Sequence, residues 1–165
     1  MRKLQSGAAQ YDWRAAALQV MLGFNSCLSK SAMWYAVFHA GPSVKMHWFD
    51  TTGKGSYKDA GTRPGADSMN GNAVMYDAVK GKILTMGGAT AYQDAAAHAT
   101  AAIITLTGMT ATTKSVSAMK YARAFAMAVV LPDGKTVVIG GQPLPVPFTD
   151  TDAVLVPGVR LCVLQ

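Results

Sequence analysis

One short pattern occurs twice in the chain at a fixed spacing. Residues 82–88 read Lys-Ile-Leu-Thr-Met-Gly-Gly and residues 135–141 read Lys-Thr-Val-Val-Ile-Gly-Gly. Each run follows a glycine, and the step from Gly81 to Gly134 is 53 residues, the same as the step between the two glycine pairs. An apolar run that begins after a turn glycine and stops at paired glycines is typical of a β-strand. The pattern therefore predicts two equivalent hairpins.

The length of this repeat indicates the architecture. A period of about 50 residues, with a hairpin that ends at Gly-Gly, is typical of a kelch-type blade, a four-stranded sheet of a β-propeller. Glycine suits the inner strands of a propeller, where backbones approach closely and side chains would clash. The strands of the first blade are expected at residues 70–77, 82–86, 102–106 and 113–117. Those of the second are expected at residues 126–131, 135–139 and 153–156, where Pro157 ends the third strand. Two unrelated hairpins of a β-sandwich are the alternative.

Composition supports an all-β fold. All nine acidic residues are Asp, and the chain has no Glu, a good helix former, but 16 Gly and 7 Pro. We therefore expect one to two four-stranded blades of an incomplete propeller, preceded by an irregular N-terminal segment. One full blade should span about 70–120 and most of a second about 123–157, within a propeller-like region 41–165.

The N-terminal segment, residues 1–40, stays unassigned and is expected to be poorly ordered. A basic start and the apolar run 15–24 loosely resemble a signal peptide, but Asp12 and Arg14 precede the run and Gln19 interrupts it. A second apolar run, residues 32–38, is too short to cross a membrane. We expect no membrane partner.

The charge pattern argues against a nucleic-acid partner. The net charge is +6, but the Lys and Arg residues are spread singly along the chain and alternate with no aromatic cluster. The two cysteines, Cys27 and Cys162, lie near opposite ends and predict neither a disulfide framework nor a zinc site.

Several short runs, taken in order, resemble the middle of glyoxal oxidases, which are relatives of galactose oxidase. The runs are residues 41–50, 67–77, 121–125, 131–134, 140–142 and 146–148. The resemblance covers roughly residues 41–157 and implies a family of secreted copper radical oxidases. Such enzymes oxidise aldehydes or primary alcohols with O2 and release hydrogen peroxide. Their fold is a seven-bladed kelch propeller followed by an immunoglobulin-like domain.

The resemblance also implies a copper site with two Tyr and two His ligands, one Tyr being cross-linked to a Cys. The family's adjacent Tyr-His pair follows an Arg and one further residue, ahead of Leu-Pro-Asp-Gly. The same frame here begins at Arg123, and Phe125 and Ala126 take the two ligand positions. Neither side chain has a donor atom, so this blade is expected to be purely structural. Cys27 and Cys162 lie outside the matched region, and neither can be assigned to the cross-link.

The histidines do not replace the missing ligands in the sequence pattern. His39, His47 and His98 are not grouped at a strand or helix spacing, so each is interpreted as a surface or packed histidine. The sequence therefore predicts no catalytic, cofactor-binding or metal-binding residue, and no copper on this chain.

The leading hypothesis is a fragment of a secreted glyoxal oxidase-like enzyme, inactive alone, whose parent converts an aldehyde and O2 to an acid and hydrogen peroxide. A second is a small kelch-like protein-binding module that works through loops around Tyr92 and Phe148. A third is one part of an intact enzyme that flanking sequence completes. Exposed blade faces predict self-association. The substrate, the origin of the chain, the role of residues 1–40 and the state of the two cysteines stay open.

Overall fold

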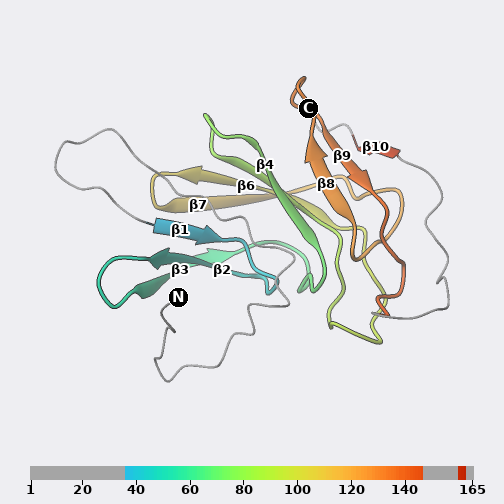
Figure 1. Ribbon diagram of the computed structural model, residues 1–165, viewed down its shortest axis with the longest axis horizontal. Helices are drawn as coiled ribbons and strands as arrows, with labels where there is room; N and C mark the ends of the chain where they lie inside the picture. Colours follow the sequence, from blue (N-terminus) through green and yellow to red (C-terminus); the bar gives the residue numbers. More distant parts are fainter. Residues whose placement is uncertain (1–35, 147–159, 163–165) are drawn as a thin grey trace.

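The computed structural model describes residues 36–146 and 160–162, and in this part of the chain every regular element is a β-strand. The strands form three antiparallel sheets that follow one another along the sequence (Figure 1). The all-β prediction is confirmed.

The middle sheet is a complete four-stranded meander in the order β4-β5-β6-β7. Its strands are β4 (Asn72–Asp77), β5 (Lys82–Met86), β6 (Ala101–Thr107) and β7 (Thr110–Val116). The predicted turn at residues 78–80 is confirmed: the Lys80 N–H donates to Asp77 Oδ1 over 2.9 Å, and Gly81 adopts a φ of 61°. The fourth strand begins three residues earlier than predicted, because Gly108, with a φ of 57°, makes a tight turn directly after β6.

The third sheet contains the second predicted hairpin, β8 (Met127–Val130) and β9 (Thr136–Ile139), followed by β10 (Arg160–Cys162). The hairpin closes where expected, with the Gly134 N–H donating to Leu131 O over 2.9 Å. The strand that pairs with β9 is β10, not the predicted third strand at 153–156. Those predicted residues lie outside the described part of the chain.

The first sheet lies partly inside the segment that the sequence left unassigned. Its strands are β1 (Ala36–His39), β2 (Lys45–Asp50) and β3 (Ser56–Thr62), in that order. Residues 36–39 of that segment therefore form a strand of the first sheet. β1 alternates between buried and half-buried positions, and the ring centroids of Phe38 and Trp48 lie 4.9 Å apart in the core. Residues 1–35 lie outside the described part.

Glycine conformation relates the three sheets to one another. Gly41, Gly88 and Gly141 follow β1, β5 and β9 and have φ values of 106°, 99° and 96°. A backbone at such an angle strongly favours glycine. β1 is therefore the counterpart of β5 and β9, the second strand of a blade.

Two apolar clusters hold neighbouring sheets together. Between the first and middle sheets lie Ala36, Phe38, Ala40, Met46, Trp48, Ile83, Ile104 and Leu106. Between the middle and third sheets lie Leu84, Met86, Ala101, Met119 and Val138. Because the middle sheet is covered on both faces, four consecutive residues of β5 are buried, where a sheet with one solvated face would show alternation.

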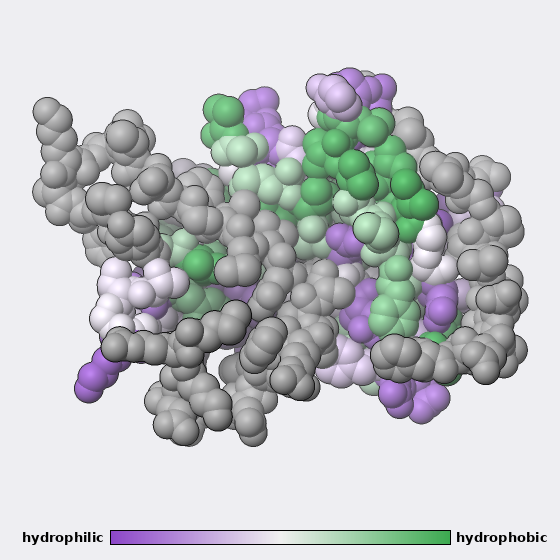
Figure 2. Space-filling view, in the orientation of Figure 1, coloured by the Kyte–Doolittle hydropathy of each residue, from purple (hydrophilic) through white to green (hydrophobic). Residues whose placement is uncertain are grey.

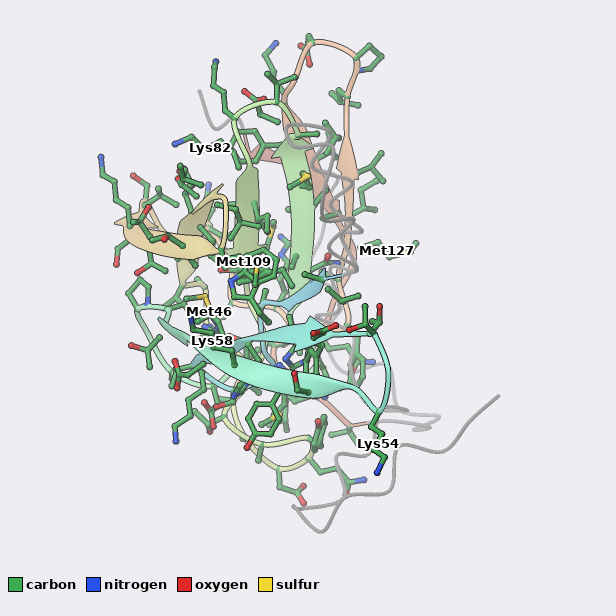
Figure 3. The ribbon with its side chains drawn as sticks, turned by 90° about the vertical axis from the view of Figure 1, so that its left-hand side faces the viewer. Met46, Lys54, Lys58, Lys82, Met109 and Met127 are labelled. Atoms are coloured by element: carbon green, nitrogen blue, oxygen red, sulfur yellow. The ribbon has the colours of Figure 1, made fainter. Side chains whose placement is uncertain are left out.

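The far side of the third sheet carries exposed apolar side chains. Met127 is 70% exposed, and Val129 and Ile139 are also exposed. Figure 2 shows a continuous hydrophobic area over β8 and β9, and Figure 3 shows Met127 projecting away from the sheets. A second hydrophobic layer on this side would complete the packing that the middle sheet already has.

Candidate functional site

Each of the two matched blades begins with the same backbone arrangement. An isolated antiparallel bridge joins Met69 to Ala89 in one blade and Ala124 to Gln142 in the next. The residue after each first partner has a positive φ: 57° at Asn70 and 56° at Phe125. The equivalent of Phe125 in the preceding blade is therefore Asn70, 55 residues earlier, because the first hairpin is two residues longer.

The main-chain groups of Phe125 and Ala126, which stand at the family's two ligand positions, are hydrogen-bonded to the preceding blade. The Phe125 N–H donates to Asn70 O over 2.8 Å, and Ala126 O accepts from Asn72 Nδ2 over 2.6 Å. The side chains themselves are hydrocarbon, and the Phe125 ring is 39% exposed. These contacts show a structural role for the segment, joining consecutive blades at the start of their first strands.

Residues with positive φ are concentrated at this end of the blades. We call it the glycine end, and it consists of Gly87–Gly88, Gly140–Gly141 and the loop 89–97. Among the described residues, the non-glycine residues with positive φ are Asn70, Asp94 and Phe125, and all lie at the glycine end or beside it. Asn70 Nδ2 donates to Tyr92 O over 3.1 Å, which ties the loop to the strand start. Such backbone strain is concentrated at functional sites, particularly where a bulky residue adopts it. The glycine end is therefore the candidate functional surface.

Two arginines are buried beside these glycines. Arg123 Nη1 donates to Gly140 O over 2.8 Å, and Arg63 Nη2 donates to Pro42 O over 2.8 Å. Each guanidinium thus bonds a carbonyl next to a left-handed glycine, while its Nε stays buried without a hydrogen-bond partner. Burial lowers the pKa of Arg63, and the nearby Asp67 charge partly opposes that shift. The two arginines fix the strand ends against the next loop.

His98 is half-buried, and both of its ring nitrogens lie close to polar atoms. Its Nε2 lies 3.1 Å from Asp67 O and 3.3 Å from Ser68 Oγ, while its Nδ1 lies 2.7 Å from Thr100 Oγ1. Because a carbonyl can only accept, Nε2 carries the proton and Nδ1 accepts from Thr100. The nitrogen beside Ser68 is therefore not free to take its proton. This geometry excludes a Ser-His nucleophilic pair.

The other two histidines lie together, a proximity that their spacing along the chain did not reveal. His39 on β1 and His47 on β2 are register partners, with ring centroids 6.1 Å apart. The signal that would have found the pair is the β1–β2 hairpin around Gly41, whose first strand was not recognised. Burial first, and then the charge of His47, lower the pKa of His39.

The described residues do not fit the copper site of the resembled family. Within residues 36–146 and 160–162, no group of three or more His, Cys, Asp or Glu side chains could hold a metal ion. The ligand positions of the recognised frame carry Phe125 and Ala126, which offer copper no donor. In the same part of the chain, no helix is long and apolar enough to cross a membrane.

Comparison with known proteins bears out the resemblance at the level of the wider family. No protein-family model matches the sequence. Galactose oxidase of Gibberella zeae is 48% identical over 132 residues, which are 75% of this chain and 19% of the relative. A fungal alcohol oxidase of the AA5 family, solved in complex with copper, is 47% identical with a TM-score of 0.67, over 70% of this chain and 25% of that chain. The chain thus spans about a fifth of its curated relative, and its sheets match part of the propeller of an AA5 oxidase.

Proposed function

We infer that this homologue of galactose oxidase and of the AA5 alcohol oxidases serves as a propeller segment of a copper-dependent oxidase. The inference rests on the sequence frame that begins at Arg123. This frame matches that of the family in order, but Phe125 and Ala126 stand where the family has its Tyr-His ligand pair. In this proposal the described residues supply blade packing and the glycine end, and the metal ligands come from other parts of the parent enzyme.

The parent reaction that we propose is oxidation of a primary alcohol. The alcohol loses two electrons and two protons to become an aldehyde, and O2 gains them to become hydrogen peroxide. Copper, when bound, supplies the redox chemistry. The names of both relatives, galactose oxidase and alcohol oxidase, support an alcohol as the substrate class. Oxidation of an aldehyde to an acid, implied by the resemblance to glyoxal oxidases, is the narrower alternative within the same family.

A peroxide assay tests both the assignment and the substrate class. The purified chain is incubated with Cu²⁺ and either galactose or methylglyoxal, and hydrogen peroxide is followed with a peroxidase-coupled dye. We expect no peroxide above the blank from this chain with either substrate, while galactose oxidase under the same conditions gives a clear signal. Copper-dependent peroxide from the chain would show that it holds a complete site. Its substrate preference would then decide between alcohol and aldehyde.

A protein-binding module is the second candidate function. It is favoured by the exposed side chains of Tyr92 and Leu144 in two loops near the glycine end. The other predicted loop residue, Phe148, lies outside the described part of the chain. A pull-down from the source organism, repeated with Tyr92→Ala, would support this function only if the substitution removes a specific, identified partner.

Secretion is a further proposal, implied by the resemblance to secreted oxidases. Immunoblots of culture medium and cell lysate would test it. Detection in the medium supports secretion, and retention with the cells contradicts it.

A further inference from the structure

Two of the three histidines of the chain share the face of the first sheet that points away from the middle sheet. His39 and His47 face each other across β1 and β2, with an angle of 34° between their ring planes. Their neighbours Phe38 and Trp48 point to the opposite face and are buried against the middle sheet. The strand pleat therefore fixes both imidazoles on one side of the hairpin.

Aromatic rings flank the histidine pair. The Phe49 ring centroid lies 5.7 Å from that of His39, and the Tyr57 ring centroid lies 5.6 Å from that of His47. Nδ1 of His39 is buried and has no hydrogen-bond partner. A buried, unsatisfied nitrogen in a native structure calls for an explanation, of which a bound water or ion is one.

The protonation of His39 also suits a ligand role. Burial and the neighbouring His47 both lower the pKa of His39, so its ring is neutral at neutral pH. Neutral imidazole is the form that coordinates a metal ion.

We propose that His39 and His47 together bind a divalent cation that favours nitrogen ligands, such as Zn²⁺, with water completing its coordination. Two imidazoles on one zinc, each bonded over about 2.0–2.1 Å, hold their ring centroids roughly 5–6 Å apart. The observed centroid separation of 6.1 Å lies just above that range.

The site rests on these two side chains alone. Asp59 on β3 is the register partner of His47 on its other side, but Asp59 Oδ1 accepts the Gly61 N–H. No third protein ligand joins the pair among the described residues. A site with two protein ligands binds more weakly than the three- and four-ligand sites of zinc proteins, and it keeps open positions for water or a further ligand.

Histidine labelling tests the site directly, because each histidine falls in a different tryptic peptide. The peptides 31–45, 46–54 and 83–114 contain His39, His47 and His98 respectively. The untagged full chain is labelled with diethyl pyrocarbonate in the absence of metal, with Zn²⁺, and with Mg²⁺, which prefers oxygen ligands. Mass spectrometry then gives the labelling rate at each histidine.

We expect Zn²⁺ to slow labelling of His39 and His47 and to leave His98 unchanged. His47→Asn should abolish the protection of His39, and His39→Gln should abolish the protection of His47, with circular dichroism confirming that each variant is folded. Tyr57→Phe, which removes only the hydroxyl of a neighbouring ring that is not part of the proposed site, should retain both effects. Because the readout needs no enzyme activity, it is independent of the proposed oxidase function.

Four outcomes would overturn the proposal. Zn²⁺ could fail to protect either histidine, or protect His98 equally, or protect His39 as well in the His47→Asn variant as in the original chain. Equal protection by Mg²⁺ would also contradict a nitrogen-selective site.

Discussion

Replacing Gly88 by alanine tests whether the left-handed glycines define the blades. A Cβ at Gly88 would lie 2.8 Å from Ser68 Cα and Ser68 C, both of them backbone atoms that cannot rotate away. The residue also has a φ of 99°, which L-residues rarely adopt. Gly134→Ala is the matched control, because Gly134 has a φ of 81° and no atom within 4 Å of the position that a methyl group would take.

Both substitutions place an L-residue in a left-handed backbone, but only Gly88→Ala also crowds neighbouring atoms. A left-handed backbone costs an L-residue about 1–2 kcal/mol, and this applies to both variants. Overpacking against fixed atoms adds about 1–3 kcal/mol at Gly88 alone. We therefore expect Gly88→Ala to lower the free energy of unfolding by about 2–5 kcal/mol, and Gly134→Ala by about 1–2 kcal/mol. Against the stability of a typical domain, about 5–15 kcal/mol, the larger loss is a substantial fraction of the whole.

Urea unfolding followed by circular dichroism measures the difference between the two variants. If Gly88→Ala is too unstable to give a folded baseline, loss of its β-sheet circular-dichroism signal in buffer would itself agree with the predicted destabilisation. Equal stability of the two variants, within about 0.5 kcal/mol, would refute the close approach of Gly88 to Ser68 and with it the equivalence of the blade ends.

Three further predictions test other parts of the structure. Phe38→Ala should lower the free energy of unfolding in urea by about 3–5 kcal/mol, because Phe38 is fully buried. Tyr57→Ala, at a position 61% exposed, should change it by at most about 0.5 kcal/mol. Similar losses in the two variants would contradict the placement of β1 in the core. Met127→Lys should reduce self-association in size-exclusion chromatography, because it interrupts the exposed apolar face of β8 and β9, and an unchanged elution profile would contradict that role. Hydrogen bonds from the Lys135 side chain and N–H lower the pKa of Asp133, so the stability it contributes is present above its unfolded-state pKa of about 3.9 and is lost as the pH falls through the lower folded pKa. Asp133→Asn should therefore flatten the dependence of stability on pH below about 4, as measured by urea unfolding across that range, and an unchanged slope would contradict the assigned hydrogen bonds.

The hairpins could be predicted because their signals are local. A turn glycine, an apolar run and a glycine pair all fall within a few residues of one another, and the same order occurs twice. β1 carries a weaker version of the signal, in which Ala40 stands where the later blades have the first glycine. With only four residues in the strand, its alternation was too short to recognise. The strand is fixed instead by tertiary packing of Phe38 against Trp48.

The candidate sites depended on contacts that spacing alone does not reveal. The sequence places Phe125 in the frame that resembles the family's ligand pair, but it does not reveal that Phe125 has a left-handed backbone or that its N–H bonds Asn70 of the preceding blade. His39 and His47 are eight residues apart, a separation typical of no metal motif, and only the hairpin register brings them opposite each other. The same applies to Ser68 and His98, which belong to different loops.

A chimera tests most directly the central claim that this chain is a propeller segment without copper ligands. Residues 36–146 replace the matched segment of Gibberella zeae galactose oxidase, and the purified protein is assayed for copper content and for peroxide production from galactose. If the segment supplies blade structure and the metal ligands come from elsewhere, the chimera should bind as much copper as the parent enzyme and release peroxide. A folded chimera that binds no copper would contradict the account, because the replaced segment would then have supplied ligands that residues 36–146 do not have.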